Sequence, residues 1–318
     1  MSECMTYKAT LYDSQYSGKV NVTAVSIGVL SEEARRSQKG GMFNYNPCSD
    51  EGRIDRICIG QDEKGRNVYW SIGHEYMSNS HLMVNGVSGA GKTTAVNLIV
   101  KELFRKKKKV IYVDFTQSAT DKRLEQTGID KEFISKNIMR NNINDVVNNP
   151  DELEAALSLL SEQDIILLFE TSKYDESVES FLGMLYDRMA DGYTDSIYLV
   201  IDEIHELNYS KGSPLYNIME KGRGKDVALI GIFQGAHETK PKQYSMLNQA
   251  DMKLIFRLND RKDAETVAES NGLKPLGEFA DRILKLKKRK CLVVGNLEDD
   301  EGNLESRRFI EVEIANAY

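Results

Sequence analysis

The sequence predicts an α/β protein with one large, mostly parallel sheet that is covered by helices on both faces. Two observations lead to this prediction. From residue 81 onward, short apolar segments of strand length alternate with longer segments whose apolar residues recur at a helical period. The short segments are nearly continuous hydrophobic runs, which are typical of strands buried on both faces of a parallel sheet.

The expected elements follow one another in a regular order. Strands are predicted over residues 81–86, 110–115, 164–170, 196–203, 227–234 and 251–258. Helices are predicted over residues 93–104, 150–163, 176–190 and 263–272. In the first helix, for example, Val96, Ile99 and Leu103 recur at helical spacing. The last two apolar segments, CLVVGNL and RRFIEVEI, are predicted to form an antiparallel hairpin at the edge of the sheet.

The first 75 residues have a different pattern and are predicted to form a small, partly β-stranded appendage, with residues 76–318 as the main domain. Residues 20–30 have the composition of a strand, and residues 31–41 that of a short helix that ends at a glycine pair. The segments RICIG and NVYWSI are separated by the turn-rich QDEKGR, which predicts a β-hairpin over residues 56–72. The appendage is expected to contact a partner or a neighbouring subunit.

The composition excludes several classes of protein. Of 318 residues, 41% are hydrophobic, so the chain can bury a sizeable core. The four cysteines show no spacing of metal ligands and indicate free thiols in a reducing compartment. No apolar run approaches the ~20 residues of a membrane helix, and the N-terminus lacks the apolar core of a signal peptide. We therefore expect a cytoplasmic protein without membrane insertion, in which any nucleic-acid contact depends on local basic patches, because the net charge is -7.

The most specific motif is GVSGAGKT at residues 86–93, which matches the phosphate-binding pattern G-x-x-x-x-G-K-[ST] in full. It lies between a predicted strand and a predicted helix, as the mechanism of phosphate binding requires. Lys92 is expected to reach the β- and γ-phosphates of ATP, and the Thr93 hydroxyl is expected to bind Mg²⁺. The expected nucleotide-binding residues are Gly86, Val87, Ser88, Gly89, Ala90, Gly91, Lys92, Thr93 and Thr94.

A pair of carboxylates follows the buried segment YLVI, at Asp202 and Glu203. In a parallel sheet the carboxyl ends of the strands form the ligand-binding edge, so this pair is expected beside the phosphate loop. We expect Asp202 to bind Mg²⁺ and Glu203 to orient and deprotonate the attacking water. The sequence therefore predicts Mg²⁺-dependent hydrolysis of ATP.

Six segments carry a resemblance that goes beyond these two motifs. In chain order they are IGQDEKGRNVYW, HLMVNGVSGAGKTT, VIYVDFTQSA, YLVIDEIHEL, KGRGKDVALIGIFQ and MKLIFRLNDRKDAETVA. Together they resemble the HerA/FtsK superfamily of ring-forming P-loop motors over roughly residues 54–314. The resemblance implies a RecA-like P-loop NTPase domain, assembly into a hexamer, and passage of double-stranded DNA through a central pore.

The resemblance also implies roles for three residues outside the two motifs. Gln234, at the end of the segment VALIGIFQ, would act as a polar sensor of the γ-phosphate. Arg223, in Gly222-Arg223-Gly224, would act as an arginine finger on the ATP of a neighbouring subunit. Arg257, in the segment IFRL, is the competing candidate for that finger.

Two basic runs, RKKKK at 105–109 and KLKKRK at 285–290, have two interpretations, either solvated surface charge or contact with nucleic acid. The leading functional hypothesis is an ATP-driven DNA translocase that works with a nuclease or another effector. DNA processing, anti-phage defence and mobile-element transfer all use such motors. Two alternatives stay open: a secretion- or conjugation-type assembly ATPase that acts on protein, and an interaction module controlled by nucleotide.

Overall fold

The computed structural model describes residues 10–11, 20–21, 56–72, 80–116, 119–127, 129–190, 196–225, 227–234, 249–298 and 304–314. The chain forms two compact units, Met1–Asn44 and Tyr45–Tyr318. In the first unit, the short strands β1 (Thr10–Leu11) and β2 (Val20–Asn21) pair antiparallel. The helix predicted at residues 31–41, and most of the strand predicted at residues 20–30, lie outside the described residues.

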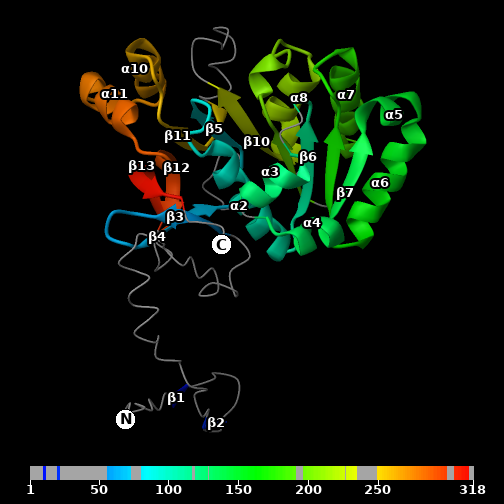
Figure 1. Ribbon diagram of the computed structural model, residues 1–318, viewed down its shortest axis with the longest axis horizontal. Coiled ribbons are helices and arrows are strands. Elements are labelled where there is room, and N and C mark those ends of the chain that lie inside the picture. Colours follow the sequence, from blue (N-terminus) through cyan, green and yellow to red (C-terminus); the bar gives the residue numbers. More distant parts are fainter. Residues whose placement is uncertain are drawn as a thin grey trace. The chain divides into compact units, whose positions relative to one another are not determined.

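The second unit is built on one sheet, whose described strands have the order β13-β3-β4-β12-β11-β5-β10-β9-β6-β8-β7 (Figure 1). The part of the sheet from β11 to β7 is parallel throughout, which confirms the mostly parallel sheet that the sequence predicts. Its strands are β11 (Met252–Phe256), β5 (Leu82–Gly86), β10 (Val227–Gln234), β9 (Ile197–Ile201), β6 (Lys109–Asp114), β8 (Ile166–Glu170) and β7 (Ile138–Asn142).

The remaining strands of the sheet form two antiparallel hairpins, both of which the sequence predicts. They are β3 (Arg56–Gln61) with β4 (Asn67–Ser71), and β12 (Lys290–Glu298) with β13 (Leu304–Glu313). Because β4 also pairs with β12, and β13 with β3, the two hairpins close into an antiparallel ring. This ring joins the parallel part of the sheet through the pairing of β12 with β11.

The β3–β4 hairpin is part of the large sheet, whereas the sequence assigned it to an appendage of residues 1–75. Its side chains explain the difference, because Ile57 and Trp70 are fully buried in the same core as the phosphate-loop strand. The Trp70 ring packs edge-on against Tyr198 of β9, with 6.2 Å between the ring centroids. The hairpin therefore belongs to the second compact unit, which begins at Tyr45.

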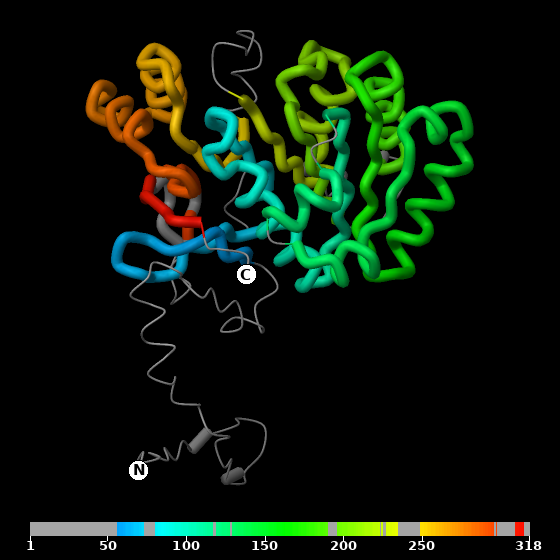
Figure 2. Tube along the Cα trace, in the orientation of Figure 1, coloured from blue at the N-terminus to red at the C-terminus, as the bar shows by residue number. Residues whose placement is uncertain are grey.

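Helices cover both faces of the parallel sheet, as predicted. Successive side chains of each strand point to opposite faces of the sheet, so they pack into different cores. Leu82 and Val84 of β5 face the core under α2 (Lys92–Arg105), α3 (Asp121–Gln126) and α4 (Lys131–Asn137). Met83 faces the opposite core, formed with α5 (Ile143–Asn148), α6 (Pro150–Glu162), α7 (Glu176–Ala190) and α8 (Pro214–Lys221). A third core lies under α10 (Arg261–Ser270) and α11 (Leu276–Lys285). Figure 2 shows α10 and α11 grouped beside the antiparallel strands.

The predicted boundaries agree closely with most of these elements. The structure has α7 over residues 176–190 and β10 over residues 227–234, as the sequence predicts. Several elements were missed: β7 and the helices α3, α4, α5, α8 and α11. Within the described part of the chain, no helix combines the length and the apolar character needed to cross a membrane.

Candidate active site

The phosphate loop connects β5 to α2 and needs glycine at two positions for steric reasons. Gly91 precedes the helix with φ of 116°, in the left-handed region that side chains rarely adopt. A Cβ atom at Gly86 would lie 2.6 Å from the Cβ atom of Phe256 on the neighbouring strand β11. Both glycines let the loop turn tightly from the sheet edge into the start of α2.

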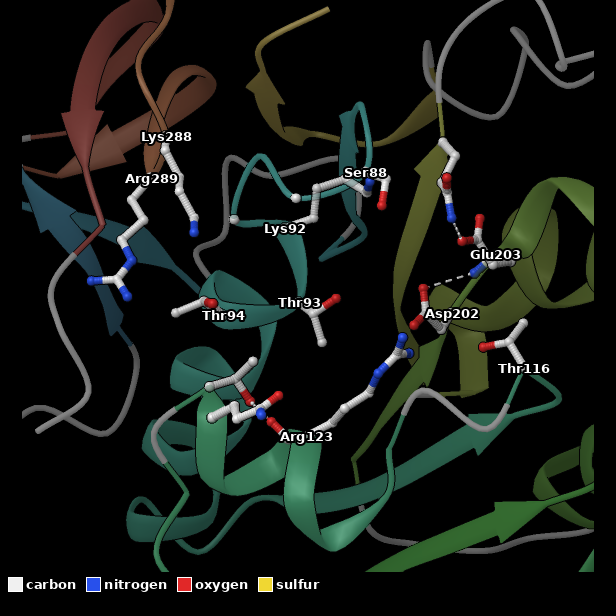
Figure 3. Close-up of a pocket in the computed structure, with 15 residues that line it drawn as sticks. Ser88, Lys92, Thr93, Thr94, Thr116, Arg123, Asp202, Glu203, Lys288 and Arg289 are labelled. Carbon is white, nitrogen blue, oxygen red and sulfur yellow. Dashed lines mark hydrogen bonds between the residues drawn. The ribbon is translucent and has the colours of Figure 1, made fainter.

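Lys92, the first residue of α2, lies against the inside of this loop. Its side-chain ammonium donates to the carbonyl oxygens of Gly86, at 2.7 Å, and of Val87, at 3.2 Å. Burial lowers the pKa of Lys92, and the negative charges of Glu203 and Asp202 oppose this effect. Figure 3 shows Asp202 and Glu203 on the opposite side of the site from Lys92 and the phosphate loop.

The acid pair follows β9, which the sheet places between β10 and β6. Asp202 is buried, and its carboxylate accepts a hydrogen bond from the backbone N–H of Glu203 at 3.0 Å. Glu203 itself has φ of 52°, an unfavourable backbone conformation for a residue other than glycine. The Gln234 amide, at the end of β10, donates a hydrogen bond to the Glu203 carboxylate. His205 also lies close, with its Nδ1 atom 3.3 Å from Glu203 Oε2.

The phosphate loop, the acid pair and Gln234 line one cavity of about 600 Å³ at the carboxyl edge of the parallel strands (Figure 3). Nine of the predicted site residues line this cavity, which are Ser88, Gly89, Gly91, Lys92, Thr93, Thr94, Asp202, Glu203 and Gln234. Gly86, Val87 and Ala90 complete the loop through their backbone carbonyl groups, which accept hydrogen bonds. The structure thus brings the two predicted motifs together around a single space.

Of the two arginines that compete for the finger role, only Arg257 has a described side chain, and it does not line this cavity. Arg257 follows β11 with an exposed side chain, and its carbonyl oxygen accepts the N–H of Val87 at 3.0 Å. Arg223 belongs to the short helical turn Gly222–Lys225 between α8 and β10. Its side chain lies outside the described residues.

Sequence reasoning missed six residues that also line the cavity, which are Thr116, Arg123, Gln126, Thr127, Lys288 and Arg289. Thr116 lies two residues after the end of β6, so the sheet-edge rule that located Asp202 would also have located Thr116. Arg123 reaches into the cavity from α3, a short helix that was not predicted (Figure 3). Lys288 and Arg289 belong to the basic run 285–290, which had been considered only for solvation or nucleic-acid contact.

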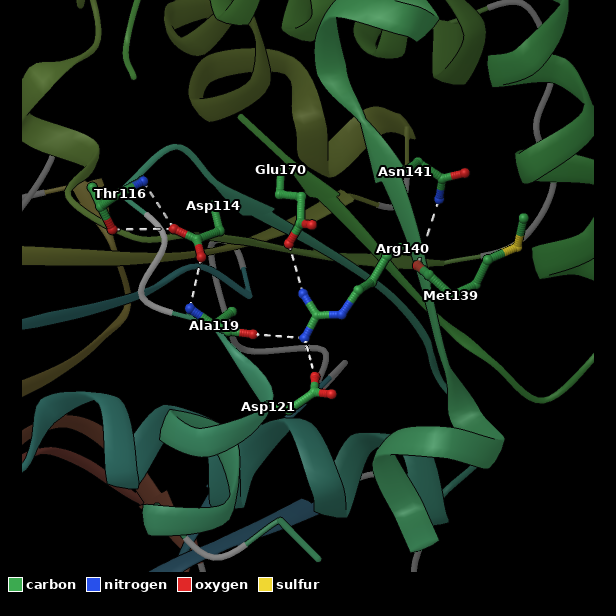
Figure 4. Close-up of polar contacts among 8 residues, drawn as sticks. All are labelled: Asp114, Thr116, Ala119, Asp121, Met139, Arg140, Asn141 and Glu170. Atoms are coloured by element: carbon green, nitrogen blue, oxygen red, sulfur yellow. Dashed lines mark hydrogen bonds and ion pairs between the residues drawn. The ribbon is translucent and has the colours of Figure 1, made fainter. Parts of the chain in front are cut away.

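Helix α3 is held in place by a polar network around Arg140 of β7 (Figure 4). The Arg140 guanidinium donates to the Glu170 carboxylate at 2.6 Å and to the Ala119 carbonyl oxygen at 2.9 Å. It also pairs with Asp121, the first residue of α3. On the other side, buried Asp114 accepts the N–H of Ala119 at 2.6 Å. The wall of the cavity that contains Arg123 is therefore fixed to three parallel strands, β6, β8 and β7.

The oxygen ligands in the cavity suit a hard divalent cation. Within the described residues there is no cluster of three or more His, Cys, Asp or Glu side chains that would bind a metal without other ligands. The Thr93 hydroxyl and the Asp202 carboxylate line the same space as the phosphate loop. Mg²⁺ is typically bound by one or two protein oxygens together with phosphate oxygens and water. The residues present therefore fit Mg²⁺ that arrives with a nucleotide.

A glycine-rich loop that places a lysine opposite an acid pair, at the carboxyl edge of a parallel sheet, defines a P-loop ATPase. The family comparison makes this more specific. Residues 57–294 match the family model DUF87, described as the central domain of helicase HerA. The chain belongs to this family and is a P-loop ATPase of the HerA type, which confirms the resemblance seen in the sequence. No curated protein sequence matches the chain.

The solved structure of VirB4 supports the fold, and B204 is also similar. VirB4 of Thermoanaerobacter pseudethanolicus aligns with a TM-score of 0.56 and 13% identity, over 81% of this chain and 96% of that chain. The genome packaging NTPase B204 from Sulfolobus turreted icosahedral virus 2, in complex with AMP, aligns with a TM-score of 0.47 and 14% identity. That alignment covers 72% of this chain and 97% of B204. The likeness to VirB4 shows a shared P-loop ATPase fold.

Proposed function

We propose that this protein hydrolyses ATP with Mg²⁺ and uses the reaction to move double-stranded DNA as a hexameric ring motor. The observation that carries the proposal is the shared cavity in which Lys92 lies opposite Asp202 and Glu203. Membership of the HerA family, whose description names a helicase, supports DNA as the substrate that is moved.

Each residue of the cavity has a distinct role in this proposal. The loop from Gly86 to Thr94 binds the triphosphate with its backbone N–H groups, and Lys92 neutralises the β- and γ-phosphates. Thr93 and Asp202 bind Mg²⁺, which when present offsets the charge that develops on the transferred phosphoryl group. Glu203 accepts a proton from the attacking water, which it holds in line with the γ-phosphate.

The contact between Gln234 and Glu203 links the general base to the strand that borders the phosphate loop. In this role Gln234 senses the γ-phosphate and passes its presence to Glu203. A neighbouring subunit contributes the charge that stabilises the transition state. We assign this charge to Arg223, on the turn that precedes β10, with Arg257, the exposed residue that follows β11, as the alternative.

The wider setting follows from the motor proposal. A ring motor that moves DNA in the cytoplasm works on behalf of an effector, and we propose a nuclease or another DNA-processing protein in that role. Anti-phage defence and mobile-element transfer are the pathways that we favour, beside general DNA processing.

The test is ATP turnover with and without duplex DNA, combined with the molar mass of the protein in solution by light scattering. A ring-sized assembly whose turnover rises on addition of DNA is the expected result. A monomer whose turnover ignores DNA would overturn the motor while leaving the ATPase intact. Turnover that ignores DNA and rises with a protein partner would instead favour an assembly ATPase that acts on protein.

A further inference from the structure

The turn between α11 and β12 forms one wall of the nucleotide cavity. None of the sequence motifs predicts that this turn lies there. Lys288 and Arg289, on this turn, line the cavity together with Lys92 and Thr94. Their neighbours in the same basic run, Lys285 and Lys287, are exposed and do not line it. Lys288 is also exposed and Arg289 is partly buried, so what separates these two residues from their neighbours is that they line the cavity. Two of the five cations of the run face the nucleotide site.

The turn is fixed to the phosphate loop by backbone contacts. The N–H of Arg289 donates to the carbonyl oxygen of Ala90 at 2.8 Å, and the Arg289 carbonyl accepts the N–H of Ile314 at 2.9 Å. A Cβ atom added at Gly91 would lie 3.2 Å from the Cα atom of Arg289, so glycine is what permits this close approach. Arg289 itself has φ of 65°, a strained conformation that the surrounding contacts hold. The side chains of Lys288 and Arg289 therefore project from a backbone that is fixed to the phosphate loop.

The position of the turn indicates which part of the nucleotide it faces. In the view of Figure 3, Lys288 and Arg289 lie on one side of Lys92, and Asp202 and Glu203 lie on the other. The γ-phosphate must lie next to Glu203 for hydrolysis, so the rest of the nucleotide extends toward the turn. Two cations there would meet the α- and β-phosphates, which both ATP and ADP carry.

We infer that Lys288 and Arg289 form a second phosphate-binding element, which acts within the same subunit and binds the diphosphate shared by ADP and ATP. Cations that contact groups present in both the ground state and the transition state strengthen binding uniformly. Their loss raises KM and the Kd of ADP. Two of the five cations of the basic run 285–290 thereby serve nucleotide binding.

The experiment measures ADP binding by calorimetry with the full chain and two double variants that remove the same charge. Lys288→Gln with Arg289→Gln removes the two cavity cations and keeps an unbranched polar side chain at both positions. Lys285→Gln with Lys287→Gln is the control, at two positions of the same run that do not line the cavity. We expect the Kd of ADP to rise at least about tenfold in the first variant and to change less than about twofold in the control.

Equal ADP affinity in the cavity variant and the wild type would overturn the inference, as would equal weakening in both double variants. If the cavity variant does not unfold cooperatively, Lys288→Gln alone replaces it, because Lys288 lies outside the strained backbone position. The inference depends on the nucleotide site of the proposed function, but ADP binding requires neither DNA nor turnover. A wild type that binds ADP and ignores DNA would defeat the motor and leave this inference standing.

Discussion

Glu203 has several features that set it apart from its neighbours. It adopts a left-handed backbone conformation, accepts a hydrogen bond from Gln234, and lies within 3.3 Å of His205. Such strain persists only where surrounding contacts hold it, and it commonly occurs at functional sites. The carboxylate is thus held at one place at the end of β9, as a general base must be.

The first prediction for a single residue concerns Glu203→Gln. Because the amide cannot accept a proton, turnover should fall about 10²- to 10⁴-fold, while the affinity for ATP stays within a few-fold of the wild type. Steady-state hydrolysis and equilibrium binding of a nonhydrolysable analogue measure the two effects. Glu206→Gln serves as the matched control, since that side chain is 55% exposed and outside the nucleotide cavity. Near-normal turnover in Glu203→Gln would place the general base elsewhere.

A second residue, His81, links the phosphate-loop strand to its neighbours and is fully buried. The N–H of Leu229 donates to its Nδ1 atom at 2.9 Å, so Nε2 carries the ring proton and donates to the Met219 carbonyl at 3.1 Å. Burial lowers the pKa of His81, although the Met219 hydrogen bond and the charge of Asp251 oppose this effect. The native state therefore holds the neutral ring.

This burial predicts a dependence of stability on pH. As pH falls below about 6.5, the unfolded chain takes up a proton at residue 81 that the native state does not, so the free energy of unfolding decreases. The decrease is at most about 1.4 kcal/mol per pH unit. Urea unfolding at about pH 7.5 and about pH 5.5 should show a larger loss in the wild type than in His81→Gln. All other ionisable groups are the same in both proteins, so an equal loss in both would contradict the prediction.

At the scale of elements, the sequence was most informative where one strand or helix carries its own pattern. Continuous apolar runs located β6, β9 and β10, and the helical period of residues 176–190 located α7. By contrast, β7 has the sequence IMRNN, which shows neither an apolar run nor a clean alternation. It becomes a strand because its backbone pairs with the edge of β8, a partner that lies over 20 residues away and that no local pattern reveals.

The residues of the candidate site likewise divide into those that a local motif predicts and those that it does not. Lys92 and Asp202 follow from local motifs, because a phosphate loop and an apolar strand end with carboxylates each have a defined chemistry. Arg123 and Lys288 could not be placed, since their positions depend on how α3 and the α11–β12 turn pack on the sheet. A run of lysines looks the same in sequence whether it faces water, DNA or a nucleotide.

The network around Arg140 gives a prediction at the scale of elements. Arg140→Gln removes ion pairs to Asp121 and Glu170 and the hydrogen bond to the Ala119 carbonyl. We expect the free energy of unfolding to fall by about 1 kcal/mol, because these groups are partly exposed to solvent. We also expect faster amide hydrogen exchange over residues 119–127, measured by mass spectrometry.

A matched control for this change is Lys136→Gln. Lys136 pairs with Glu132 on the surface of α4, where both side chains are largely exposed, so its loss should have little effect. Unchanged exchange at residues 119–127 in Arg140→Gln, or an equal change in the control, would show that the network does not hold α3.

At the scale of the whole molecule, the antiparallel ring and the parallel sheet share one core. Ile57, Trp70, Cys291 and Val312 of the ring belong to the same buried cluster as Val84 of the phosphate-loop strand. The turn that carries Arg289 precedes β12 of this ring and is hydrogen-bonded to Ala90 of the phosphate loop. The ring is thus part of the ATPase unit, and its strands come from both ends of the second compact unit.

This continuity predicts how the chain responds to truncation. A protein that begins at Tyr45 keeps the whole second compact unit and should unfold cooperatively, with an ADP affinity close to that of the full chain. A protein that begins at residue 76 lacks β3 and β4, so β12 and β13 lose strand partners and Tyr198 loses its contact with Trp70. Removing one buried tryptophan side chain alone costs about 3–5 kcal/mol, against a total stability of about 5–15 kcal/mol.

Circular dichroism during thermal unfolding, combined with ADP calorimetry, distinguishes the two truncated proteins. We expect one sharp transition for residues 45–318, and a broad transition or aggregation for residues 76–318, because the loss of the hairpin exposes apolar surface and unpaired strand edges. Equal midpoints and equal ADP affinities would mean that the hairpin is a separable appendage and that the functional boundary lies near residue 75. A loss of cooperativity in the shorter protein alone would place the hairpin within the ATPase unit, as the burial of Ile57 and Trp70 requires.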